Sequence, residues 1–122
     1  MKDIQMGAVE SRFAEIIWEN EPVSTTELVK SSESALQWKK TTTYTVLKRL
    51  CEKGIFKNEG GTVTSLISRE DFYSLRSERF VEEEFQGSLP AFLAAFTKRK
   101  SLSVEEIEVL RRMVEEYEGE RK

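Results

Sequence analysis

Residues 39 to 50 read KKTTTYTVLKRL, a stretch that combines poor helix formers with helical spacing. Three consecutive threonines open a helix badly, because β-branched side chains lose χ1 freedom there. The spacing of the apolar side chains nevertheless predicts a helix over 40–53, which Gly54 ends. The buried face would consist of Thr43 through its methyl group, Val46, Leu47 and Leu50, with Cys51 at its edge as a small packed hydrophobe.

The opposite face of this helix carries hydroxyls and cations. At about 100° per residue, an arc of about 120° contains Thr41, Thr42, Thr45, Lys48, Arg49 and Glu52. Hydroxyls and cations bind phosphates, threonine methyls contact the thymine methyl, and Lys or Arg can reach guanine edges. Short side chains at a helix N-terminus also let backbone N–H groups approach an anion. A plain solvated surface is the simpler alternative, and Tyr44 borders both faces. We predict DNA contacts by Lys39, Lys40, Thr41, Thr42, Tyr44, Thr45, Lys48 and Arg49.

Two shorter helices are predicted before this one. Apolar residues at spacings of three and four indicate a helix over about 7–19, which Pro22 closes. Ser24 and Glu27 then form a capping box, which predicts a second helix over about 25–32. A polar break at 31–34 should separate it from the threonine-rich helix.

A β-hairpin is predicted after the threonine-rich helix. Residues 55–59 and 62–67 resemble two short strands, and Gly60-Gly61 easily supplies the positive φ values of the turn between them. Three helices followed by a hairpin are the layout of a winged helix-turn-helix, whose third helix enters the major groove while the hairpin lies along the DNA backbone. Unless the hairpin is only a surface turn, the candidate wing contacts are Lys57, Asn58 and Thr62.

The rest of the chain predicts three further helices, which begin near Ser68, Ser88 and Ser103. The fold class is therefore mostly α with a small β-hairpin wing. We expect two domains, a winged helix-turn-helix DNA-binding domain over 1–67 and a C-terminal helical dimerisation domain over 68–122.

A second copy of the chain is the expected partner of the C-terminal helices. Short amphipathic helices over 68–122 bury themselves poorly, so that pairing would cover their apolar faces. A twofold dimer would also present two reading helices to a pseudo-palindrome. The predicted dimer contacts are Phe72, Leu75, Val81, Phe85, Phe92, Phe96, Ile107, Leu110, Val114 and Tyr117.

Positive charge is concentrated around the opening stretch. The 122 residues are 39% hydrophobic and 34% charged, with a net charge of −3. Residues 38–57 nevertheless carry six Lys or Arg against Glu52 alone, a net charge of +5, whereas 68–122 carry −3. This distribution favours an anionic partner for the first domain and keeps the C-terminal part away from DNA.

Composition excludes several other functions. The chain has no histidine and a single cysteine, so it offers no internal disulfide, no ordinary zinc site and no Ser-His-Asp or Cys-His catalysis. We therefore expect no enzyme, no metal and no cofactor. The N-terminus lacks a signal-peptide core, and no apolar run approaches the roughly 20 residues that cross a bilayer. This predicts a cytoplasmic protein without membrane insertion.

Three stretches carry a resemblance to a known family: IIWENEPVSTTELV at 16–29, TTTYTVLKRLCEKGIFK at 41–57 and LAAFTKRKSLSVEEIEVLRRMVEEY at 93–117. They resemble the penicillinase repressor family, which contains the β-lactamase, methicillin-resistance and copper-responsive repressors, and the resemblance covers nearly the whole chain. It implies a homodimeric winged-helix repressor that binds double-stranded operator DNA of dyad symmetry and blocks transcription.

The resemblance also implies how repression would be relieved. In the β-lactam-responsive members a membrane sensor signals proteolysis within the dimerisation helices, and the matching bond here joins Ala95 and Phe96. A membrane sensor or protease that acts on the repressor is therefore an expected partner. The paired C-x-C motifs of the copper-responsive branch are missing, since the chain ends EEYEGERK, so copper sensing by that route is excluded.

A function of a different class stays open at this point. Winged helices also serve as protein-interaction adaptors without sequence-specific DNA binding, and the threonine-rich face would then bind a protein partner. The charge of +5 over 38–57 speaks against an adaptor, while the acidic remainder and the short wing keep it open.

Overall fold

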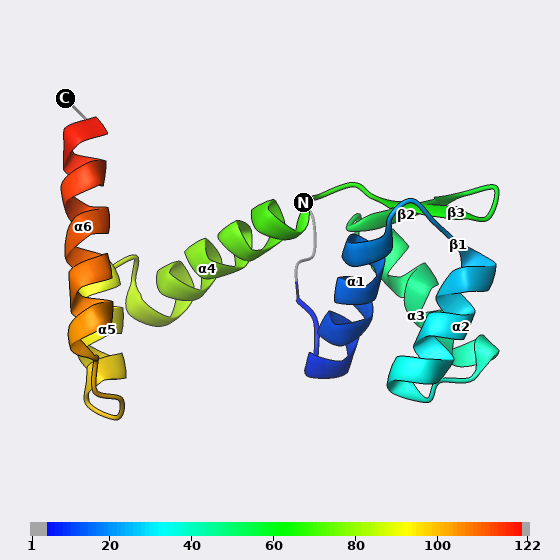
Figure 1. The fold of residues 1–122 in the computed structure, drawn as a ribbon, viewed down its shortest axis with the longest axis horizontal. Helices are drawn as coiled ribbons and strands as arrows, with labels where there is room; N and C mark the ends of the chain where they lie inside the picture. Colours follow the sequence, from blue (N-terminus) through cyan, green and yellow to red (C-terminus); the bar gives the residue numbers. More distant parts are fainter. Residues whose placement is uncertain (1–4, 121–122) are drawn as a thin grey trace. The chain divides into compact units, whose positions relative to one another are not determined.

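The computed structural model describes residues 5–120, which form six helices and a three-stranded antiparallel sheet (Figure 1). The prediction of a mostly helical chain with a small β-hairpin wing is confirmed. Two compact units make up the chain; the first ends at Arg79 and the second begins at Phe80, so α4 contributes to both. The elements in order are α1 (Ala8–Asn20), β1 (Val23–Ser24), α2 (Thr25–Leu36), α3 (Lys40–Glu52), β2 (Phe56–Glu59), β3 (Thr62–Ser65), α4 (Arg69–Phe85), α5 (Leu89–Thr97) and α6 (Val104–Glu120).

The second helix is longer than expected. α2 continues through residues 31–34, so the predicted polar break is wrong. Ser32 lies completely buried there, because its small side chain fits within the core. The helix ends at Gln37, whose left-handed backbone (φ 59°) directs its N–H at the carbonyls of the last turn. Its start is as predicted, since the Ser24 hydroxyl accepts a hydrogen bond from the N–H of Glu27 at 3.1 Å.

The sheet contains one strand that was not expected. β1 pairs antiparallel with β3, with Val23 opposite Val63 and Ser24 opposite Thr62, which gives the strand order β1-β3-β2. Two residues cannot display the period-2 pattern of a strand, so only the folded unit reveals it. β2 and β3 form the predicted hairpin, and the two glycines of its turn have φ values of 59° and 86°, the positive values that a type I′ turn needs.

One apolar core holds the first unit together. Thr43 belongs to it as predicted, because it is 1% exposed and its hydroxyl donates to the Lys39 carbonyl at 3.2 Å. With this side of α3 fixed in the core, the opposite side must face solvent. The large side chains that are completely buried are Phe13, Ile17, Leu28, Leu50, Ile55, Phe56, Val63 and Phe72.

The buried hydroxyl of Ser32 has no hydrogen-bond partner among residues 5–120. Burying a hydroxyl costs free energy, and here no hydrogen bond offsets that cost. We therefore expect Ser32→Ala to raise the free energy of unfolding by about 1 kcal/mol. Urea unfolding followed by circular dichroism measures the change. Ser34→Ala, at an exposed position of the same helix, is the matched control and should stay within about 0.5 kcal/mol. A clear loss of stability in Ser32→Ala would mean that this hydroxyl is bonded in solution.

The second unit is held by contacts between aromatic rings and has little interior. Neither α5 nor α6 contains a buried residue within the range that the structure describes. Four phenylalanines of α4 and α5 instead pack against one another tilted or edge-on, with ring centroids 5.5 to 6.0 Å apart. They are Phe80, Phe85, Phe92 and Phe96.

Candidate nucleic-acid interface

The solvent side of α3, together with the residue just before it, presents every side chain that the sequence assigned to it. Tyr44 is 38% exposed, which agrees with its expected place at the border of the two faces. Because the core side of α3 is fully packed, the helix cannot turn this surface inward. The exposed residues are Lys39, Lys40, Thr41, Thr42, Tyr44, Thr45, Lys48 and Arg49.

The threonines of this surface differ in what their hydroxyls do. The Thr45 hydroxyl donates to the Thr41 carbonyl at 2.8 Å and is therefore satisfied within the helix. The Thr41 and Thr42 hydroxyls bond to no residue within 5–120, which leaves them available to a ligand. They lie at a helix N-terminus that Lys39 does not cap with its side chain, so the first N–H groups can also bind an anion.

The cations of this surface are of two kinds. Arg49 turns toward α1, where its Nη1 lies 3.6 Å from Oε2 of Glu10, and Lys53 Nζ lies 4.0 Å from the same oxygen. A phosphate that binds Arg49 must compete with this carboxylate. No sequence pattern linked Glu10 to α3, because the two meet only in the folded unit. Three lysines form no ion pair within residues 5–120: Lys39, Lys40 and Lys48.

The three predicted wing residues are exposed, but two of them already have partners. Lys57 Nζ lies 2.8 Å from Oε1 of Glu59, and this hydrogen bond and charge lower the pKa of the Glu59 carboxyl below its usual value. Asn58 accepts the N–H of Gly61 through Oδ1 at 3.1 Å and thus shapes the turn, while its amide hydrogens stay available. Thr62 is exposed at the start of β3.

The helix and the wing share one hollow. Its lining comes from α3 and β2, so the structure brings predicted residues of both elements together. Cys51 lies half-buried in it, and burial, with the nearby charge of Glu52, raises the pKa of the thiol. Such a thiol is protonated at neutral pH and reacts slowly. The lining residues are Tyr44, Leu47, Lys48, Cys51 and Asn58.

The described part of the chain brings together no three Cys, Asp or Glu side chains that could hold a metal ion. Within the same residues, no helix is both long and apolar enough to cross a membrane.

Phe72 requires a correction. The sequence placed it on the dimerisation surface, but the structure buries it completely in the core of the first unit, where its ring lies 5.4 Å from that of Trp18. A side chain without exposed surface cannot contact a second copy of the chain. The apolar spacing along α4 showed which side of the helix is apolar but not which unit covers it.

The other proposed dimer contacts keep exposed surface. Sequence reasoning missed five further exposed apolar side chains among residues 68–120: Phe80, Leu89, Val104, Val109 and Met113. A spacing of four residues joins Val109, Met113 and Tyr117, and that signal would have found two of them. The remaining proposed contacts, none of them buried, are Leu75, Val81, Phe85, Phe92, Phe96, Ile107, Leu110, Val114 and Tyr117.

Comparison with known proteins identifies relatives along the whole chain. The penicillinase repressor of Bacillus licheniformis is 29% identical over 127 aligned positions, which cover 100% of this chain and 99% of that protein. The methicillin resistance regulatory protein MecI of Staphylococcus aureus (strain Mu50) is 25% identical and covers 93% of this chain and 95% of its own length.

One solved relative has both a similar fold and a similar sequence. The solution structure of the monomeric form of Bacillus licheniformis BlaI, in complex with the blaP half-operator, matches with a TM-score of 0.50 and 30% identity. The match covers 58% of this chain and 93% of that one. The penicillinase repressor family model matches residues 6–116. The resemblance seen in the sequence is thereby confirmed, and this chain belongs to the penicillinase repressor family.

Proposed function

We propose that the chain is a homodimeric transcriptional repressor that binds dyad-symmetric operator DNA in the cytoplasm. α3 enters the major groove, and the β2–β3 hairpin lies along the backbone. The observation that carries this proposal is the exposed side of α3, where hydroxyls and lysines without a partner among residues 5–120 lie at and after a helix N-terminus that no side chain caps. All three groups bind phosphate, and the hydroxyls and methyls can also touch base edges.

The solved relative supports the same assignment. BlaI was determined with one half-operator, and its likeness to this chain includes both fold and sequence. In a twofold-symmetric dimer on a dyad operator, each copy contacts one half-site, so a single copy bound to a half-operator corresponds to half of that complex. The winged unit of this chain is therefore proposed to read one half-site.

Dimerisation is supported by the apolar side of α6. At about 100° per residue, the apolar residues of this helix occupy an arc of about 160°, wider than a single surface helix needs. Two hollows lie along that arc, and Leu110 lines both of them. Since the described part of the second unit has almost no interior, a second copy is the proposed cover. The arc consists of Ile107, Val109, Leu110, Met113, Val114 and Tyr117.

We propose cleavage between Ala95 and Phe96 as the means of relief, with a membrane sensor or protease as the partner. Both residues are exposed, which gives access to the bond. The bond lies within α5, where the Ala95 carbonyl accepts the N–H of Lys98 and the Phe96 carbonyl accepts that of Lys100. A protease that binds an extended chain must therefore open the last turn of α5 before it cuts.

DNA binding is tested with the promoter of the chain's own operon and with random duplex of equal length. The wild type should prefer the promoter, and its affinity should fall steeply with salt, because lysines displace counterions from phosphates. Lys48→Ala should lower the magnitude of the salt slope by about one. The matched control, Lys30→Ala on α2, should leave the slope unchanged.

Two outcomes would contradict this proposal. Equal affinity for promoter and random DNA at moderate salt would remove sequence-specific binding. Full promoter affinity in a Thr41→Ala, Thr42→Ala, Lys48→Ala triple variant would instead favour the protein-interaction adaptor, whose exposed α3 binds a protein.

A further inference from the structure

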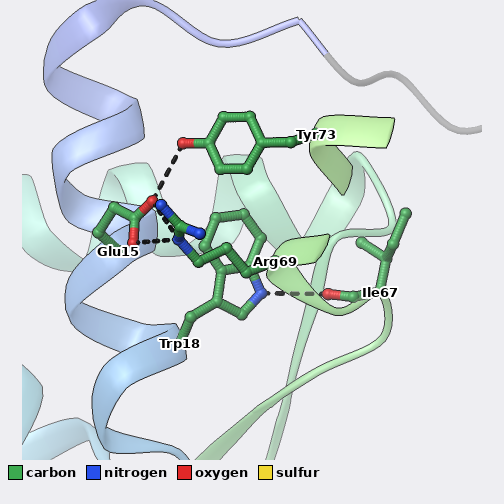
Figure 2. A network of polar contacts seen from close by, with 5 residues as sticks. All are labelled: Glu15, Trp18, Ile67, Arg69 and Tyr73. Atoms are coloured by element: carbon green, nitrogen blue, oxygen red, sulfur yellow. Dashed lines mark hydrogen bonds and ion pairs between the residues drawn. The ribbon is translucent and has the colours of Figure 1, made fainter. Parts of the chain in front are cut away.

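Residues of α1 hold the chain where α4 begins, as Figure 2 shows. The Nε of Arg69 lies 2.7 and 2.8 Å from the two carboxylate oxygens of Glu15, and the Tyr73 hydroxyl donates to Oε1 of the same carboxylate at 3.1 Å. The Nε1 of Trp18 donates to the carbonyl of Ile67 at 3.1 Å, two residues before α4. Four hydrogen bonds therefore fix both the entry to α4 and its first two turns on α1.

An aromatic layer lies under these polar contacts. The Trp18 ring lies 5.2 Å from the ring of Phe56 and 5.4 Å from that of Phe72, which is completely buried. The Tyr73 ring meets Phe72 edge-on at 5.4 Å, and the Arg69 guanidinium lies 5.1 Å from the centre of the Tyr73 ring. The same α4 turns are thus held by apolar burial and by directed polar bonds.

The two kinds of contact contribute differently. Burial of Phe72 supplies most of the free energy, because a fully buried phenylalanine removes a large apolar area from water, whereas the attraction within an exposed ion pair is screened by solvent. The Arg69 side chain is 59% exposed, so its pair with Glu15 is of the weaker kind. What the polar bonds add is direction, because two side chains on successive turns of α4, Arg69 and Tyr73, make three hydrogen bonds to one carboxylate.

The tyrosine remains a hydrogen-bond donor over the physiological pH range. Burial raises the pKa of the Tyr73 phenol, and its hydrogen bond to Glu15 raises it further. The proton that Tyr73 donates to Glu15 is therefore retained well above neutral pH.

The chain leaves the first unit only through α4. We propose that Glu15, Arg69 and Tyr73 are positioning residues for operator recognition: they fix the direction in which α4 leaves the DNA-reading unit and thereby the half-site spacing that the dimer accepts. This inference rests on the proposed dimeric operator binding. None of the three residues belongs to α3 or the wing, so reading of a single half-site does not need them.

The test measures spacing preference separately from half-site affinity. Wild-type protein first selects a half-site from randomised duplexes. Fluorescence anisotropy then measures affinity for a single half-site, for the best dyad, and for dyads lengthened or shortened by two base pairs. Two base pairs rotate one half-site by about 70° around the DNA axis, so the wild type should prefer the best dyad by at least about tenfold.

Glu15→Ala removes all the bonds of the carboxylate at once. Its half-site affinity should stay within about twofold of the wild type, while its spacing preference falls to about threefold or less. Glu70→Gln is the control. It removes a carboxylate from the turn of α4 that carries Arg69, and this carboxylate has no bonding partner among residues 5–120. The spacing preference of Glu70→Gln should stay at the wild-type value, and that of Tyr73→Phe should lie between the values of the wild type and Glu15→Ala.

An unchanged spacing preference in Glu15→Ala overturns the inference. If that variant fails to fold, Tyr73→Phe combined with Arg69→Gln gives the decision, since these changes keep the apolar layer. A wild type that selects no half-site refutes the proposed function, and the inference with it. A wild type that shows a spacing preference shared by all variants refutes the inference alone.

A second readout does not involve DNA. Spin labels at Thr26→Cys in a Cys51→Ser background report the distance between the two winged units of the free dimer, because residue 26 is exposed on α2. Glu15→Ala should broaden the distance distribution, whereas Glu70→Gln should not. Equal widths in all three proteins would also overturn the inference.

Discussion

Phe72→Ala is expected to lower the free energy of unfolding of the winged unit by about 3–5 kcal/mol. The side chain is 0% exposed and packs in the core of the winged unit against Trp18 of α1, so its removal leaves a cavity beside Trp18. A small domain is stable by only about 5–15 kcal/mol, which means that this loss is a large share of the total. Urea unfolding followed by tryptophan fluorescence measures it, since Trp18 lies against the altered site.

The control for this prediction is the same substitution further along α4. Phe80 is 50% exposed and stacks on Phe85 and Phe92 in the second unit, so Phe80→Ala should cost about 1 kcal/mol. Unfolding is compared at two protein concentrations, because dimer dissociation adds a concentration dependence. If Phe72→Ala left unfolding unchanged and weakened only dimerisation, the side chain would face the second copy, as the sequence first suggested.

Phe72 also shows what the sequence alone could not resolve. Apolar residues recur along the whole of α4, so periodicity predicted the helix correctly. Phe72 in its first turn lies in the core of the winged unit, while Phe85 in its last turn packs edge-on against Phe92 of α5. A helix whose two ends pack in different units has the same apolar spacing in its sequence as a helix that packs in a single unit.

Most of the fold was predictable because its signals are local. The Ser24 cap and the spacing on α3 depend on neighbours within four residues, and both are found as expected. The strand β1 was missed because its pairing with β3 is a tertiary contact. The polar run in α2 was misjudged because a serine can also be buried when it is small enough for its place.

In the candidate site, too, local features could be predicted from the sequence and tertiary contacts could not. Exposure of the α3 surface followed from the opposite face being apolar, so it could be predicted from sequence. The ion pair of Arg49 with Glu10 could not, and it changes what Arg49 offers to DNA. Lys48, which has no partner within residues 5–120, is for this reason a better probe of phosphate contact than Arg49.

Leu110→Asp is expected to dissociate the proposed dimer. Leu110 lines both hollows on the apolar side of α6, which places it near the middle of the surface that a second copy would cover. Burying a carboxylate there without a partner costs several kcal/mol, so the dimer dissociation constant should rise by at least about 100-fold. Sedimentation equilibrium measures the change directly.

Val104→Asp is the matched control for this variant. It introduces the same charge on the same helix, but residue 104 is 74% exposed and lies outside the apolar arc at the start of α6. A carboxylate at a helix N-terminus is favourable, so this variant should remain folded and dimeric. Leu110→Asp should retain its affinity for a single half-site and lose affinity for the full dyad, because a monomer gains nothing from the second half-site. A Leu110→Asp protein that stays dimeric would show that the two copies meet through another surface.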